Sequence, residues 1–208
     1  EDVVRALQSV SRAFRAWGAP AKVTRVLHDG DTMEFRDRSW KVHWRPGHSQ
    51  SDTVFEDAER RMLIAADHLL GHISSNPLIT RPRDGTAERP QALVTYLDSL
   101  TETRAMKLDL VLPGHGDPVT EHRKLIDDRF AGHRRRADKL HRLIADRPRS
   151  AHELAQALWG NIAVTQAYLT LSEVLGHTDL LLNAGKVREV EDRGGATVRF
   201  ESIAAPAS

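Results

Sequence analysis

Between Lys22 and Ala66 the chain is a succession of short β-rich runs, which limits this segment to a sheet. Turn-forming dipeptides such as Asp29-Gly30 and Asp37-Arg38 separate the runs, and dipeptides of this kind mark the ends of strands. The pattern therefore predicts an antiparallel meander with one buried face. The predicted strands are residues 23–27, 32–35, 40–44, 53–56 and 62–66.

Helical periodicity flanks this meander. Apolar residues spaced by four and three predict an amphipathic helix over residues 2–17, which Gly18 and Pro20 end. After an irregular loop at 71–90, a helix is predicted at about 90–105, with Leu93, Leu97 and Leu100 on one face. Residues 108–112 then form an apolar run that leads into a tight glycine-rich loop, and another helix is predicted from about Thr120.

From about residue 133 the pattern changes again. Helices are predicted at about 134–146, from a capping box at Ser150 and Glu153 to Trp159, and from about 164 to Asn183, where Gly185 favours a left-handed C-cap. Runs at 187–191 and 196–201, joined through Gly194-Gly195, predict a hairpin. Three helices followed by a hairpin are typical of a winged helix-turn-helix. We therefore expect two domains, at residues 1–132 and 133–208.

Composition narrows the possible chemistry. The chain has 208 residues, no cysteine, eleven histidines and a formal net charge of +1. A metal site would thus need imidazole and carboxylate ligands, which suit zinc, iron or manganese. No apolar run approaches the roughly 20 residues that span a bilayer, and no signal peptide is recognisable, so we expect a cytoplasmic protein without membrane contact.

Three loops place a candidate metal ligand next to a predicted strand. His48 lies in Pro46-Gly47-His48, Asp67 follows the apolar run at 62–66, and His115 lies in Leu112-Pro113-Gly114-His115-Gly116. Ligands at strand ends are held by a rigid sheet, and the neighbouring glycines allow the backbone to approach a metal closely. A lone histidine beside glycine is more often a turn residue, but the three motifs occur together and in this order.

This order of motifs resembles the second half of the metallo-β-lactamase superfamily, over about residues 20–120. The resemblance implies an α/β fold of the αβ/βα sandwich type, followed here by a β-lactamase-associated winged-helix domain. It also implies that His48, Asp67 and His115 bind metal, with Asp67 bridging two zinc ions and acting as the catalytic residue. Ser49, Ser51 and Asp52 are candidates for orienting the imidazole of His48.

The family's His-x-His-x-Asp-His motif is absent, and the first residue is Glu1 rather than Met. We therefore expect that the N-terminal half of the sandwich is missing, that an apolar face is exposed, and that the chain can form a homodimer. Activity of this chain alone is an open question. His68 and His72 could replace missing ligands, although ordinary loop histidines are the favoured interpretation.

The implied activity is metal-dependent hydrolysis, in which a metal-activated hydroxide attacks a small-molecule ester, thioester or lactone. The basic stretch that starts at Arg134-Arg135-Arg136 leaves a ribonuclease of the same fold as an alternative. The second alternative is a non-catalytic module that binds a partner or regulates through the winged helix. Nucleic-acid binding by that domain is disfavoured, because residues 164–183 contain no Lys or Arg.

Overall fold

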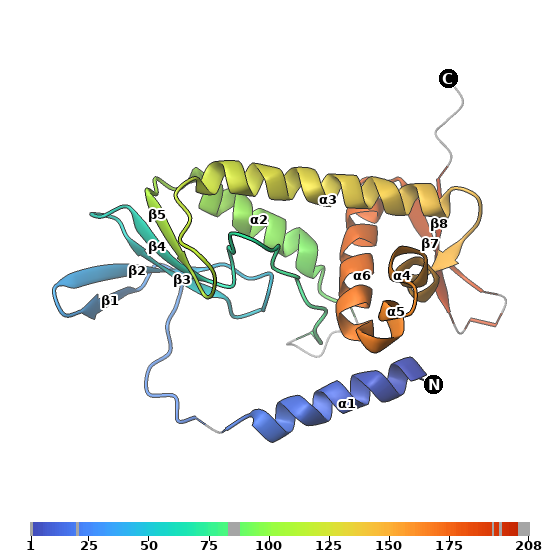
Figure 1. The fold of residues 1–208 in the computed structure, drawn as a ribbon, viewed down its shortest axis with the longest axis horizontal. Helices are drawn as coiled ribbons and strands as arrows, with labels where there is room; N and C mark the ends of the chain where they lie inside the picture. The colour runs from blue at the N-terminus through green and yellow to red at the C-terminus, as the bar shows by residue number, and fades with distance from the viewer. Residues whose placement is uncertain (1, 20, 83–87, 193, 196, 204–208) are drawn as a thin grey trace. The chain divides into compact units, whose positions relative to one another are not determined.

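The computed structural model describes residues 2–19, 21–82, 88–192, 194–195 and 197–203, and these form two compact units (Figure 1). One unit comprises residues 23–133. The other comprises residues 134–208 together with residues up to 22. The division into a metallo-β-lactamase-like domain at 1–132 and a winged-helix domain at 133–208 stays a prediction, because two compact units do not by themselves identify the family of either domain.

A five-stranded mixed sheet forms the centre of the unit at 23–133, in the order β1-β2-β3-β4-β5. Its first four strands pair antiparallel, and β5 pairs parallel with β4. Four of the five strands of the predicted meander are thus confirmed. The strands are β1 (Thr32–Phe35), β2 (Arg38–Trp44), β3 (Thr53–Asp57), β4 (Met62–Ala66) and β5 (Leu110–Pro113).

The predicted strand at residues 23–27 is wrong. These residues adopt no regular structure, and Val23 and Val26 are exposed. A β-rich sequence gains little from an extended conformation when its valines are not buried and no strand pairs with it.

The alternation of side chains along the strands produces one well-buried face, as predicted. Val54, Leu63 and Val111 are inaccessible to solvent. Their chain neighbours Phe55 and Ile64, which are cross-strand partners, lie on the opposite face and remain partly exposed.

Two helices follow the sheet strands in this unit. Helix α2 (Ala92–Ala105) lies beside the first half of α3 (His122–Ile144) in Figure 1, and Arg104 pairs with both carboxylate oxygens of Asp127 at 2.8 and 2.9 Å. The two helices predicted from Thr120 and over 134–146 are one continuous helix. A single interior Gly132 costs only about 1 kcal/mol, which is too little to end a helix of otherwise good helix formers.

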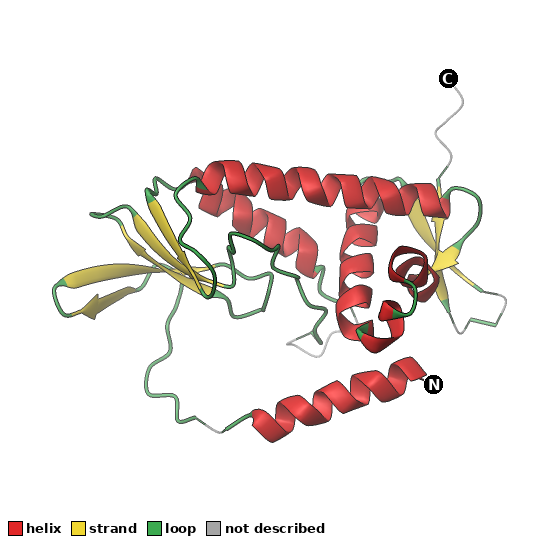
Figure 2. Cartoon of the chain, viewed as in Figure 1, coloured by secondary structure: helices red, strands yellow, loops and turns green. Residues whose placement is uncertain are grey.

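The other unit combines helices with a small sheet of order β6-β8-β7, drawn in yellow in Figure 2. Its helices lie close to the predicted positions, except that the last is interrupted at Gln166. Strand β6 was not predicted. The elements are α1 (Asp2–Trp17), β6 (Arg149–Ser150), α4 (Ala151–Trp159), α5 (Ile162–Thr165), α6 (Ala167–Asn183), β7 (Val187–Glu191) and β8 (Val198–Ser202).

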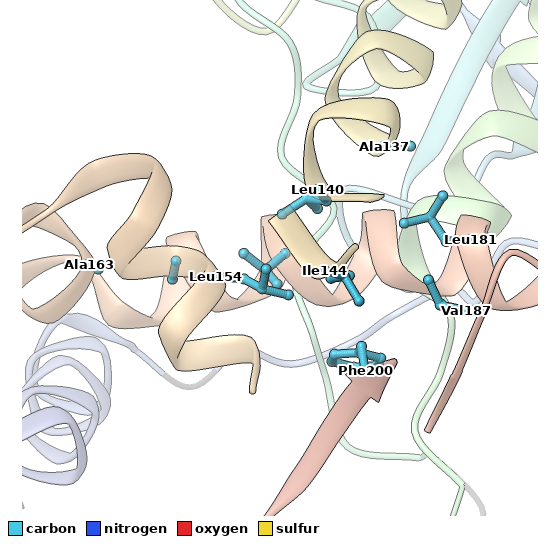
Figure 3. Packing of buried hydrophobic residues seen from close by; sticks show 10 residues of the cluster. Ala137, Leu140, Ile144, Leu154, Ala163, Leu181, Val187 and Phe200 are labelled. Carbon is cyan, nitrogen blue, oxygen red and sulfur yellow. The ribbon is translucent and has the colours of Figure 1, made fainter. Parts of the chain in front are cut away.

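Leu140 and Ile144 of α3 pack with Leu154 of α4, Leu181 of α6 and Phe200 of β8 in the core of this unit (Figure 3). The predicted capping box is present, since Ser150 and Glu153 exchange side-chain and backbone hydrogen bonds. Gly185 has φ +65° after α6, as the predicted left-handed C-cap requires.

Part of the predicted hairpin, residues 193 and 196, lies outside the described residues. Among the helices that the structure describes, none combines the length and the apolar character needed to cross a membrane.

Candidate metal centre

The structure brings His48, Asp67 and His115 together. The Oδ2 atom of Asp67 lies 3.9 Å from Nε2 of His48, and its Oδ1 atom lies 3.8 Å from Nε2 of His115. Both distances exceed those of good hydrogen bonds. The carboxylate therefore faces one imidazole with each oxygen, with a gap on both sides.

The end of β4 places Asp67 at this point. The register between β4 and β5 shifts at Ile64 and Ala66, and Ala66 has φ +44°, which is uncommon for a residue with a side chain. The amide of Gly114 donates to the carbonyl oxygen of Ala66 at 2.7 Å. Strand β4 thus ends in a bend that is tied to the loop of His115.

Gly114 is needed for this close approach. A Cβ atom on Gly114 would overlap Oδ1 of Asp67 and would also lie 3.1 Å from the carbonyl carbon of Ala66. Glycine beside His115 was expected to allow the backbone to approach a metal closely. In the structure, the atom that Gly114 accommodates is the carboxylate oxygen itself.

A backbone carbonyl orients His48. Its Nδ1 atom lies 3.1 Å from the carbonyl oxygen of Asn76. Because a carbonyl oxygen can only accept, Nδ1 carries the hydrogen, and Nε2 faces Asp67 with a free lone pair in the neutral ring. Histidine ligands in metalloproteins are commonly held in this way by an acceptor on the second ring nitrogen.

The residues expected to orient His48 have other partners. Ser49 donates to Asp52 from its amide, at 2.9 Å, and from its hydroxyl, and the carbonyl of Ser51 accepts from Thr53 at 3.0 Å. These contacts close the turn after His48 locally. The expected contacts of Ser49, Ser51 and Asp52 with the imidazole are therefore not those that the structure shows.

His68 and His72 make ordinary hydrogen bonds, as the favoured interpretation predicts. Nε2 of His68 lies 2.9 Å from the Thr103 hydroxyl, and burial lowers the pKa of His68 to about 3, with a smaller effect of Arg45 in the same direction. His72 is exposed and lies 3.1 Å from Asp117. Neither side chain pairs with Asp67 among the described contacts.

The three side chains are arranged as two ligand pairs that share Asp67. Among the described residues no group of three or more His, Asp or Glu side chains is close enough to hold one ion. The ligand atoms of two residues that bind one zinc ion are about 3.4 Å apart in tetrahedral geometry. They are about 4.2 Å apart when they lie on opposite sides of the ion. The pairs at 3.8 and 3.9 Å lie between these limits, so each would accept an ion after closing by about 0.5 Å.

Several residues around the site were not predicted. They are Ser75, whose hydroxyl donates to the carbonyl of Asp67, Asn76, and the α2 residues Tyr96, Ser99 and Thr103. The contact of Asn76 uses its backbone, which leaves no signal in the sequence. The spacing of Tyr96, Ser99 and Thr103 by three and four residues, on the same side as Leu93 and Leu100, was the one available signal.

The chain is similar to known proteins in both sequence and fold. A family model described as Metallo-beta-lactamase superfamily matches residues 8–115. The probable metallo-hydrolase YqjP of Bacillus subtilis (strain 168) is 30% identical over 174 residues, which are 84% of this chain and 54% of that protein. The chain thus spans about half the length of this curated relative.

Two solved structures are similar over nearly the whole chain. A beta-lactamase domain protein from Burkholderia ambifaria has 26% identity and a TM-score of 0.81, covering 96% of this chain and 58% of its own. A metallo-beta-lactamase family protein from Thermus thermophilus has 23% identity and a TM-score of 0.71, covering 95% and 64%; this second likeness is one of fold. With its family match, mixed sheet and helices, the chain belongs to the metallo-beta-lactamase superfamily.

Proposed function

We propose that this chain is part of a metal-dependent hydrolase in which His48, Asp67 and His115 bind two zinc ions. The observation that carries the proposal is the position of the Asp67 carboxylate, which faces Nε2 of His48 with one oxygen and Nε2 of His115 with the other. Supporting it, the superfamily to which the chain belongs binds divalent metals, and the relative from Bacillus subtilis is named a probable metallo-hydrolase.

The residues have separable roles in this proposal. Asp67 would hold one ion with each oxygen, and each histidine would complete one pair. Bound divalent ions lower the pKa of water toward neutrality and so supply a nucleophile for hydrolysis. The half-exposed Asp67 and the exposed His115 leave solvent access to the gap between the ligands. Nitrogen and oxygen ligands would also suit iron or manganese.

For the substrate, we propose a small ester, thioester or lactone. A ribonuclease would need cations that follow a phosphate backbone. Of the basic stretch that suggested this alternative, Arg136 is paired with Glu173 in its own unit, so it is not free to bind phosphate. No observation favours RNA over a small acyl substrate.

For the unit at 134–208, we propose a winged helix that acts as a packing module. Its support is the order of elements, in which the second half of α3, then α4, and then α6 with the short α5 before it, precede the hairpin of β7 and β8. Much of α6 is buried, including the polar residues His177, Thr178 and Asp179. A buried helix without Lys or Arg is poorly suited to the major groove of DNA.

The deciding experiment is the zinc content of the chain after incubation with zinc and desalting. We expect bound zinc in the unaltered protein and its loss in His48→Ala and His115→Ala. His141→Ala is the matched control, because His141 lies in the unit at 134–208, where its ring forms a hydrogen bond with the hydroxyl of Ser202. Equal zinc content in all four proteins would overturn the ligand assignment.

Activity is measured separately. Thioester, ester, lactone and RNA substrates are offered to the zinc-loaded protein and to His115→Ala. Hydrolysis of an acyl substrate that His115→Ala loses would support the proposed substrate class. Turnover of RNA alone would favour the ribonuclease instead, and zinc binding without any turnover would favour the non-catalytic module.

A further inference from the structure

One face of α2 carries three buried polar side chains. Tyr96, Ser99 and Thr103 are at most 5% exposed, and they alternate with the buried Leu93 and Leu100 along the helix. Buried hydroxyl groups need hydrogen-bond partners to offset their desolvation. All three find such partners in the loops of the proposed metal ligands.

The first contact reaches the loop of His48. The hydroxyl of Ser99 donates to the carbonyl oxygen of Pro46 at 2.7 Å, two residues before His48. Gly47 is pressed against the same helix, since a Cβ atom there would lie 2.5 Å from Cβ and 2.6 Å from Cα of Tyr96. Both contacts fix the backbone of this loop against α2.

The second contact reaches the loop of Asp67. The hydroxyl of Tyr96 donates to the carbonyl oxygen of His68 at 2.9 Å. Burial raises the pKa of Tyr96 to about 12, against a smaller lowering by the Ser75 hydroxyl, so the phenol keeps its donor hydrogen at neutral pH.

Thr103 completes this contact through the side chain of His68. Its hydroxyl donates to the carbonyl of Ser99 at 3.0 Å and therefore accepts from Nε2 of His68 at 2.9 Å. His68, which directly follows Asp67, is thus held at both its carbonyl and its ring. Helix α2 thereby contacts both ligand loops through neighbouring side chains.

We propose that the face of α2 formed by Tyr96, Ser99 and Thr103 is a positioning surface that sets the separation between His48 and Asp67. The inference rests on the proposed metal site and names residues that act through the ligands rather than on the metal. Its physical basis is that a helix is stiff, so two loops bonded to one helix face keep a fixed distance. Supporting contacts of this kind typically change metal affinity about 10–100-fold.

The test compares Ser99→Ala and Tyr96→Phe with Ser172→Ala. Ser172 is the matched control for Ser99, because it is also a buried helical serine that donates to a carbonyl at 2.7 Å, in this case Tyr168 of its own helix. Zinc affinity is measured by competition with a chelator. Amide hydrogen exchange of segments 46–52 and 67–76 is measured in the metal-free protein, and stability by urea denaturation.

We expect Ser99→Ala and Tyr96→Phe to speed exchange in the ligand segments and to weaken zinc binding about tenfold or more. Ser172→Ala should lose a comparable amount of stability but should change neither the exchange of the ligand segments nor the zinc affinity. Unchanged exchange and affinity in the two α2 variants would overturn the inference. If the parent protein retains no zinc but the two α2 variants, with their fold unaltered, exchange faster in the ligand segments, the coupling through α2 is supported. That result would overturn only the metal site.

Discussion

Nδ1 of His48 donates a hydrogen bond to the backbone carbonyl oxygen of Asn76, 28 residues further along the chain, at 3.1 Å. This bond fixes both the orientation of the ring and the position of its hydrogen, so that Nε2 faces Asp67 before any metal binds. Because the acceptor is a backbone atom, the bond depends on the path of the loop that contains Asn76.

The neutral ring of His48 should therefore be the Nδ1–H tautomer in the metal-free protein. Two-dimensional 1H–15N spectra of the imidazole distinguish the two tautomers of the neutral ring. We expect His48 to show a protonated Nδ1. A protonated Nε2 would contradict the arrangement around Asp67.

Gly114→Ala should displace the Asp67 carboxylate. The new Cβ atom would overlap Oδ1 of Asp67, and the backbone of Ala66 behind it leaves little room to adjust. We expect zinc affinity to fall by about tenfold or more, measured by chelator competition.

Gly71→Ala is the control for this substitution. A Cβ atom on Gly71 would meet its nearest neighbour, Val119, at an ordinary 3.5 Å. We expect its zinc affinity to stay within about twofold of that of the parent, well short of the tenfold change that about 1.4 kcal/mol of binding free energy would give. An equal loss in both variants would show that general destabilisation, not contact with Asp67, is responsible.

Ser150→Ala should destabilise the unit at 134–208 by about 1 kcal/mol, because it removes the hydrogen bond from the Glu153 amide to the N-cap hydroxyl of α4. Urea denaturation measures the loss. Gln156→Ala, at an exposed position of the same helix, should change stability by less than about 0.5 kcal/mol. Similar effects of the two substitutions would argue against the cap.

The capping box also predicts a pH dependence. The backbone hydrogen bond from Ser150, with Arg147 and Arg199 nearby, lowers the pKa of Glu153 to about 2 against opposing desolvation. A carboxylate with a lowered pKa contributes stability above its unfolded value of 4.5, and that contribution is lost as the pH falls toward 2. In Glu153→Gln, the decline of stability between these two values should be shallower than in the parent.

His177 should destabilise the fold in mild acid. Burial lowers its pKa, opposed by Glu173 and assisted by Arg136, and Nδ1 is 2.6 Å from the carbonyl of Glu173. A histidine with a lowered pKa binds its proton first in the unfolded chain, so stability falls as the pH drops below 6.5, by at most about 1.4 kcal/mol per unit. His177→Gln should show a shallower slope in urea titrations; an unchanged slope would refute the assignment.

The sequence by itself determined most of the elements and the ligand candidates. The β-rich runs between Lys22 and Ala66, separated by turn dipeptides, predicted the meander because turn residues mark the ends of strands locally. The capping box at Ser150 and the C-cap at Gly185 were predictable because they are local interactions. His48, Asp67 and His115 were recognised from their motifs and their order. Their convergence follows from β2, β4 and β5, which run in the same direction and end at the same edge of the sheet.

The tertiary structure alone decided what depends on residues distant in sequence. Residues 23–27 have strand composition, but strand formation needs a partner, and composition does not provide one. The Asn76 carbonyl orients His48, and no side chain reveals a backbone acceptor. Tyr96 and Ser99 looked like ordinary residues of an amphipathic helix. Their contacts with His68 and Pro46 arise only when α2 packs against the loops, since long-range contacts are set by the path of the chain and not by local preference.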